Sequence, residues 1–325
     1  MQEPTTPEYL CFKKKRNLWV SCMSGADPHS IQHQIGNMLW DAAVYRIVNE
    51  ARRIAAPAPG GGVQLNGPVH GLMDKGFYIG QMMAVRRLKD RQGLYGQRGT
   101  YSLAGLLQDI KDNAHLMRRE HLFAAEGMEY DCETVRREYQ EWRLAQDRAG
   151  KKTCPMPIKF YYCRHEQRHR IIDDLAGVQP TKRCAKDVVR PEIPECLLRR
   201  LNGACDRIHA HANKFVAHAA TPQSRASMDA KDLRVSLGDL WNAHETIYKI
   251  AVFVSVHLLN DAMFSALPVP SFDQFDYIDR PLVPSDHVGD LAAAWDAYEA
   301  ETKGWRTWEV DAFVKGIEQP GCASG

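Results

Sequence analysis

Apolar side chains recur every three or four positions over most of this chain, which is the spacing of an amphipathic α-helix. The clearest case follows Ser102, a typical N-cap residue. Its apolar face is formed by Leu103, Leu106, Leu107, Ile110, Ala114 and Met117. The same reasoning predicts helices over about 27–55, 69–91, 102–117, 132–149, 195–220, 229–260 and 287–301.

The helical spacing is interrupted in the middle of the chain. Residues 150–194 contain five prolines and no sustained period, although a short strand is expected at 158–162. The predicted organisation is an N-terminal extension (1–26), an N-terminal helical half (27–149), an irregular connector (150–194), a C-terminal helical hairpin (195–262) and a C-terminal extension (263–325). We therefore expect an all-α antiparallel helical bundle with additional N- and C-terminal helices and an irregular central insertion.

The two long helices of the C-terminal half have regular apolar seams. In the first helix the predicted seam is Leu197, Leu201, Ala204, Ile208, His211, Phe215 and His218. The seam of the second helix runs from Leu233 to Leu258 and includes His244. Because Thr221 and Pro222 end the first helix, the connection is short and the two helices should pack as an antiparallel hairpin.

Composition narrows the functional classes. The formal charge of +2 is too small to indicate nucleic-acid binding by global electrostatics, so any such contact must be local. The longest apolar run, residues 250–259, is about half of the roughly 20 residues that span a bilayer, and no signal peptide is evident. The odd count of nine cysteines favours reduced thiols. We expect a cytoplasmic protein without membrane contact.

Zinc-type ligands gather in the central stretch, but their spacing is poor. The candidates are Cys154, Cys163, His165, His169 and Cys184. No two cysteines stand in a Cys-x2-Cys pair, so we expect no metal site and no cofactor. The alternative is that this basic stretch, which adjoins two tyrosines, contacts a phosphate backbone.

The segment 209–219 is the most informative part of the chain, because it places polar groups where a core helix normally has leucine. One interpretation is that His211 and His218 are neutral core histidines held by hydrogen bonds. The other is that His218, together with Asn213, forms a functional site.

The run from Asn213 to His218, followed by a turn and another long helix, resembles the HEPN-domain superfamily, in particular its abortive-infection-type branch. Upstream, Arg86 to Asp90, a glycine-rich turn and Tyr101 to Leu107 resemble the helix-turn-helix of that branch. The resemblance covers about residues 30–262. It implies a helical bundle and metal-independent RNA cleavage, in which a histidine transfers protons and an arginine stabilises the phosphate charge.

One position departs from this pattern. Ala212 stands where the family ribonucleases have arginine. The resemblance assigns His218 as general acid/base and Asn213 as its catalytic partner. For substrate binding, the candidates that could supply charge or orient His218 are Lys214, His211, Arg86 and Arg87. Arg86 is also expected to form a structural ion pair with Asp90, four residues along the helix.

Two functions therefore remain open. The first is an RNA-directed defence or toxin-type ribonuclease, with RNA as its partner. The second is a non-catalytic HEPN-like helical module that binds a partner protein or a nucleotide, which the missing arginine favours. Small residues near the end of the first hairpin helix predict a homodimer in either case. They are Ala210, Ala212, Ala217, Ala219 and Ala220.

Overall fold

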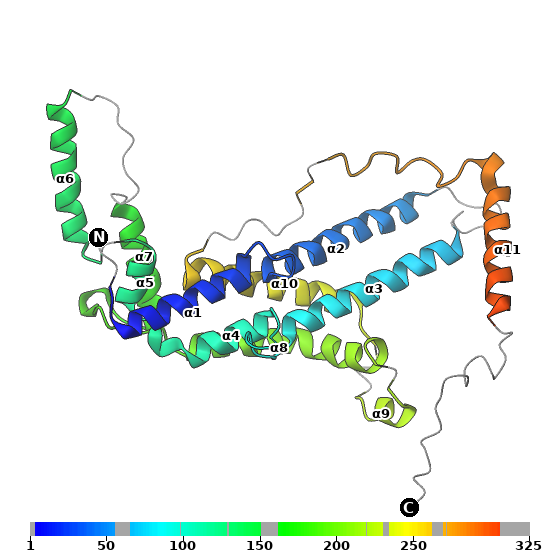
Figure 1. Cartoon of the computed structure of the whole chain (residues 1–325), viewed down its shortest axis with the longest axis horizontal. Coiled ribbons are helices and arrows are strands. Elements are labelled where there is room, and N and C mark those ends of the chain that lie inside the picture. The colour runs from blue at the N-terminus through cyan, green and yellow to red at the C-terminus, as the bar shows by residue number, and fades with distance from the viewer. Residues whose placement is uncertain are drawn as a thin grey trace, which may run out of the picture. The chain divides into compact units, whose positions relative to one another are not determined.

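Helix α8 (Glu192–His211) lies at the centre of the fold and contacts three other helices, α3 (Gly67–Lys89), α4 (Leu103–Asp112) and α10 (Leu237–Phe253). In the computed structural model these helices run alongside one another (Figure 1). The buried stripe of α8 consists of Leu198, Leu201, Cys205 and Ile208 and continues at Ala212. This three-four spacing lets one side of α8 face all three neighbours.

The structure describes residues 4–55, 66–97, 99–128, 130–150, 162–218, 220–229, 234–261, 269–270 and 272–305, without the side chains of Cys132, Tyr162 and Cys163. These residues form helices and no strand, so the all-α prediction is confirmed. The elements not yet given are α1 (Pro7–Ser24), α2 (Ile31–Ile54), η1 (Ala114–Leu116), α5 (Arg119–Ala125), α6 (Cys132–Arg148), α7 (Tyr162–Ala176), η3 (Pro180–Lys182), η4 (Ala212–Val216), α9 (Pro222–Ala226), η6 (Val254–Leu259), η7 (Ser285–His287) and α11 (Val288–Gly304). The chain forms two units, Met1–Val269 and Pro270–Gly325.

The N-terminal extension contains the additional N-terminal helix, to which the sequence pattern assigned no residue range. Thr6 caps α1 by accepting a hydrogen bond from the Tyr9 backbone N–H at 3.4 Å. The helix then buries Tyr9, Phe12, Trp19, Cys22 and Met23 against the rest of the first unit. Residues 7–24 are therefore part of the core rather than an extension.

The prediction of an irregular connector at 150–194 is also wrong in part, because α7 occupies residues 162–176. The expected strand at 158–162 falls mostly outside the described residues, and Tyr162 begins the helix. The inner side of α7 carries buried His165, Arg168, His169 and Asp173 beside Ile172 and Leu175. An apolar period cannot reveal a helix whose buried face is largely polar.

Local hydrogen bonds set the ends of several helices. Ser102 caps α4 as predicted, accepting from the Gly105 N–H at 3.1 Å. The second hairpin helix begins later than expected, at Leu237, because Ser236 and Asp239 form a reciprocal capping box. At its far end the helix widens into the π-helix η6 and stops at Asn260, whose φ of 45° is left-handed.

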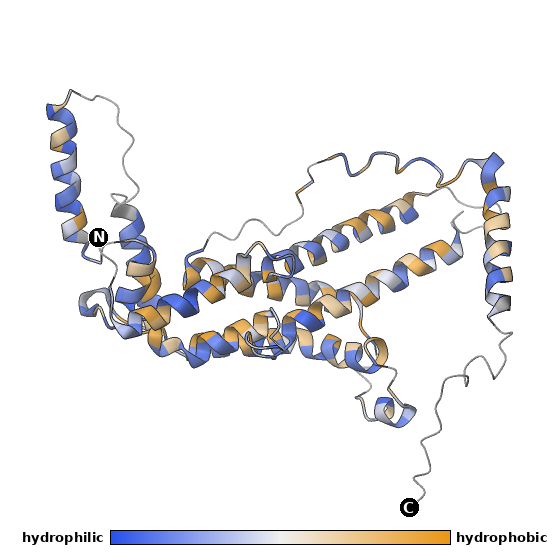
Figure 2. Cartoon of the chain, viewed as in Figure 1, coloured by the Kyte–Doolittle hydropathy of each residue, from blue (hydrophilic) through white to orange (hydrophobic). Residues whose placement is uncertain are grey.

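The buried hydrophobic residues of the helices lie where the helices pack against one another. The helices of the bundle carry mixed hydrophobic and hydrophilic faces, whereas α6 is hydrophilic along most of its length (Figure 2). The apolar seam predicted for the second hairpin helix is confirmed at Leu240, His244, Ile247 and Leu258, all of which are buried. Among the described helices, none combines the length and hydrophobicity that a bilayer crossing requires.

Asp109 of α4 joins α1 to the bundle. Its carboxylate accepts hydrogen bonds from Trp19 Nε1 at 2.6 Å, Lys15 Nζ at 2.9 Å and Tyr95 Oη at 3.0 Å. Trp19 is fully buried, so its indole N–H depends on this acceptor. The carboxylate thus ties α1 to the α4 segment.

Replacing Asp109 by Ala should lower the free energy of unfolding by about 1–3 kcal/mol, because the buried Trp19 N–H loses its acceptor. Urea unfolding followed by circular dichroism measures this. Asp112→Ala is the matched control, since Asp112 is an exposed acid one turn along α4. Equal stability of the Asp109 and Asp112 variants would contradict the role of Asp109.

Candidate functional site

The end of α8 changes its helix type at the segment singled out by sequence. From Ala212 to Val216 the chain forms the π-helix η4, in which the Ala217 N–H donates to the Ala212 carbonyl at 2.8 Å. Single π-turns inside α-helices frequently occur at functional sites. In an α-helix, residues five apart differ by about 140° around the axis. The wider i→i+5 turn reduces this angle, so the side chains after Ala212 leave the α-helical register.

Asn213 is held by an arginine from another helix. Arg86 of α3 donates from Nε to Asn213 Oδ1 at 2.6 Å. The Asn213 amide lies 3.3 Å from His209 Nδ1, and the amide N–H can donate to that nitrogen only if Nδ1 is unprotonated. Burial, with the charges of Lys89 and Arg86, lowers the pKa of His209 below its ordinary value, which agrees with a neutral ring. These contacts fix the rotamer of Asn213.

Arg86 does not form the expected ion pair with Asp90, so that prediction is wrong. Asp90 instead accepts from the Gln92 N–H at 3.0 Å. The two terminal nitrogens of Arg86 have no hydrogen-bond partner in the part of the chain that the structure describes. A guanidinium with two unused donor nitrogens beside Asn213 can bind an anion by donating two parallel hydrogen bonds to it.

The other predicted substrate-binding residues have distinct surroundings. Lys214 Nζ donates to Ser224 Oγ at 2.6 Å, which joins η4 to α9. The ring of His211 stacks on Phe215 with centroids 4.5 Å apart, and the Arg225 guanidinium lies 6.0 Å from the Phe215 centroid. Arg87 is exposed on α3. Lys214 is therefore engaged within the protein, whereas Arg87 is open to solvent.

His218 is exposed, and its side chain makes no polar contact with the described residues. The predicted seam that placed His211, Phe215 and His218 in the core is therefore wrong: Phe215 is 39% exposed and His211 is half-buried. Ala212 occupies the buried position instead. The small residues predicted to form a dimer patch do not all lie on one surface. Ala212 belongs to the core, and Ala219 lies outside the described residues.

Two cavities of the bundle lie elsewhere than the predicted site. A cavity of 600 Å³ lies among α7, α8, α10 and η6 and is lined in part by Arg199, Cys196 and His257. A second, of 390 Å³, lies between α2 and α10. Neither includes Asn213 or His218. An exposed surface of this kind suits an extended polymer better than an enclosed small molecule.

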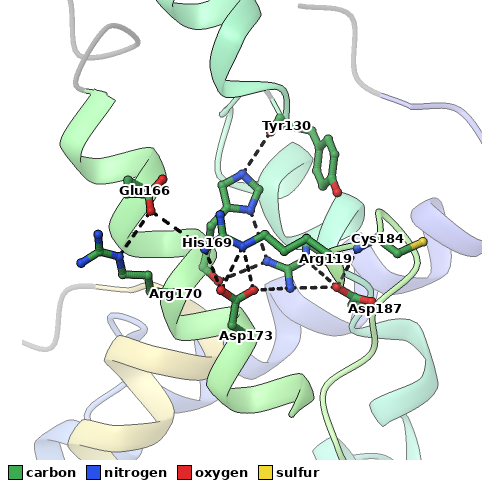
Figure 3. Close-up of polar contacts among 9 residues, drawn as sticks. Arg119, Tyr130, Glu166, His169, Arg170, Asp173, Cys184 and Asp187 are labelled. Atoms are coloured by element: carbon green, nitrogen blue, oxygen red, sulfur yellow. Dashed lines mark hydrogen bonds and ion pairs between the residues drawn. The ribbon is translucent and has the colours of Figure 1, made fainter. Parts of the chain in front are cut away.

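A second polar cluster, which sequence reasoning missed, surrounds Arg119 (Figure 3). The Arg119 side chain is fully buried and donates to Asp173 Oδ1 at 2.8 Å, to Asp187 Oδ2 at 2.8 Å and to the His169 carbonyl at 3.1 Å. Arg183 adds a bond to Asp173 at 2.7 Å. Each of the three guanidinium nitrogens of Arg119 has a partner, so the cluster is a satisfied structural network.

The ionisation states of this cluster agree with a structural role. Burial raises the pKa of Asp173, but the hydrogen bonds from Arg183 and Arg119 outweigh it and hold the pKa below its ordinary value. Burial lowers the pKa of His169, whose Nε2 donates to the Tyr130 carbonyl at 3.1 Å. The carboxylate therefore stays charged and the imidazole neutral at neutral pH.

The zinc candidates do not assemble in the described part of the chain. His165 and His169 are buried on α7, whereas Cys184 is exposed. Cys154 and the side chain of Cys163 lie outside the description. No group of three metal-type ligands occurs among the described residues. Both ring nitrogens of His169 are hydrogen-bonded, one to Arg119 and one to the Tyr130 carbonyl, so neither is free to bind a metal ion.

Comparison with protein families, with curated proteins and with solved structures found no match to this chain.

Replacing Arg119 by Ala should lower the free energy of unfolding by about 3–5 kcal/mol, because two buried carboxylates lose their shared cation. Thermal and urea unfolding measure the change. Arg118→Ala is the matched control. The Arg118 side chain is 30% exposed, and its nearest acid, Glu8, is as far as 3.8 Å away, so the expected loss of unfolding free energy is below about 1 kcal/mol. Similar losses in both variants would contradict the structural role of the cluster.

Proposed function

We propose that the end of α8, η4 and the facing part of α3 form an RNA-binding surface of a HEPN-like, metal-independent ribonuclease, in which His218 transfers protons. The observation that carries this proposal is the hydrogen bond from Arg86 to Asn213. It places a guanidinium beside the polar residue of the motif, although the motif position 212 is alanine. Arg86 thereby supplies from α3 the positive charge that the motif lacks on α8.

The chemistry needs few groups. The ribose 2′-hydroxyl loses a proton and attacks the adjacent phosphorus, and the 5′-oxygen leaves and takes up a proton. Imidazole is the side chain that exchanges protons most readily near neutral pH, and His218 is exposed to an incoming strand. The unused donors of Arg86 stabilise the charge that develops on the phosphoryl oxygens. Asn213 positions Arg86, and Arg87 contributes a backbone phosphate contact.

A second candidate function is supported by the burial of Ala212. This residue is fully buried in the core, so the position at which family ribonucleases carry arginine cannot present a side chain to substrate here. The alternative is a non-catalytic HEPN-like module that binds a partner protein or a nucleotide through the same surface. Only the first function includes cleavage of RNA, so cleavage is the property that separates the two.

His218→Ala should reduce cleavage of single-stranded RNA by about 10²–10⁴-fold while leaving the melting temperature unchanged, because the exposed imidazole contributes no packing. Cleavage is followed on gels in the presence of a chelator. His115→Ala is the matched control, since His115 is an exposed histidine on η1. Arg86→Lys keeps the charge but loses the planar fork, and it should lower cleavage with RNA binding partly retained.

The outcomes separate the two candidates. RNA that binds the wild-type protein but is not cleaved would replace the ribonuclease by the non-catalytic module. Wild-type activity in the His218 variant would remove His218 from the mechanism. A wild-type protein that neither binds nor cleaves RNA would exclude RNA as the substrate.

We also propose a homodimer that buries this end of α8. Its support is the exposure of Phe215 at a position between the half-buried Ala210 and Ala217. Light scattering at high micromolar concentration should give twice the chain mass of 36.8 kDa. Ala217→Glu should give a monomer, because it places a charge in the interface. A monomeric wild-type protein would contradict the dimer.

A further inference from the structure

The cavity of 390 Å³ between α2 and α10 arises from a mismatch in side-chain size. On each helix its lining residues stand three, four and seven positions apart, so two helical stripes face each other. Ala42 and Ala43 form the α2 side, opposite Trp241 and Tyr248 of α10. The short alanine side chains leave the space that a larger pair would fill. Its volume lies in the range of small-molecule sites.

His244 lines this cavity in an unusual state. It is only 3% exposed, and neither ring nitrogen has a hydrogen-bond partner. Burial, with the nearby charge of Arg46, lowers the pKa of His244 to about 4, so the ring is neutral at physiological pH. A neutral imidazole carries one donor and one acceptor. Buried polar atoms in folded proteins nearly always have partners, and the described residues provide none for this donor and this acceptor.

Arg46 supplies a charge at the cavity rim. It is exposed, and its guanidinium lies 4.5 Å from the centroid of the Trp241 ring. No acid pairs with it among the described residues, because the neighbouring Glu245 is bonded to Lys249. The rim therefore offers a cation that lies over an aromatic ring and has no acidic partner among the described residues.

We propose that this cavity binds a small planar heteroaromatic anion, with its ring against Ala42, Ala43 and Trp241, its ring heteroatoms bonded to His244 and its anionic group on Arg46. Mononucleotides and indole carboxylates share this chemistry. The flat apolar walls select an aromatic ring, His244 selects heteroatoms, and Arg46 selects the charge. This site is separate from the proposed RNA surface and does not depend on its activity.

Isothermal titration calorimetry of the full chain tests the proposal with the four ribonucleoside monophosphates, indole-3-carboxylate and inorganic phosphate. At least one ring-bearing anion should bind with a Kd below about 1 mM, and inorganic phosphate should not. Comparing the nucleotide titrations with the indole-3-carboxylate titration shows which of the two kinds of anion the cavity binds. Affinity for indole-3-carboxylate, which is ionised throughout, should be constant between about pH 5.5 and pH 7.5, since His244 stays neutral there. Absence of binding by every ring-bearing anion, or equal binding of phosphate, would overturn the proposal.

Two variants locate the binding. Ala43→Leu fills the cavity and should abolish binding. His244→Phe keeps the ring shape but removes both polar atoms, so it should weaken binding about tenfold while raising the melting temperature. A structural histidine would not produce these opposite effects. Asn242→Ala is the control, because Asn242 is exposed on α10 outside the lining. Wild-type affinity in either the Ala43 or the His244 variant would overturn the proposal.

Discussion

The burial of one stripe of α8 is the constraint on which the rest of the first unit depends. Leu201, Cys205, Ile208 and Ala212 are fully buried, and helices α3, α4 and α10 all pack around α8. Once this stripe is buried, the rotation of α8 about its own axis is fixed. Asn213 directly follows the last buried position and meets α3 at Arg86. The hydrogen bond at the candidate site is thus a consequence of how α8 packs in the core.

Polar side chains in this bundle differ in burial and in whether they have hydrogen-bond partners. Around Arg119 every buried charge has a partner, which fixes α5 and α7 to the segment containing Asp187. At His244 a buried ring has none. At His218 the ring is exposed. Only the rings of His244 and His218 have nitrogens left to bond a ligand or substrate. The Arg119 cluster contains more charged groups, but these groups already bond to one another, so its role is structural.

Apolar periodicity was sufficient to predict the helices that bury leucine and isoleucine, including α4, α8 and α10 with the Ser102 cap. It failed for α1 and α7 for different reasons. In α1 the basic run 13–16 interrupts an apolar face that resumes at Trp19. In α7 the buried face is largely polar, and two of its charged groups have partners that lie 42 and 54 residues away in sequence. Spacing along one segment contains no information on such partners.

The candidate site shows the same division between local and tertiary information. Sequence identified Asn213, His218 and Arg86 separately, yet the bond between Asn213 and Arg86 joins positions 127 residues apart. The exposure of His218 has a local cause that periodicity also misses. A seam drawn with 3.6 residues per turn assumes that the α-helix continues, but the backbone widens into a π-helix at Ala212. The extra residue in that turn carries the following side chains out of the α-helical register, so a histidine at core-like spacing reaches solvent instead.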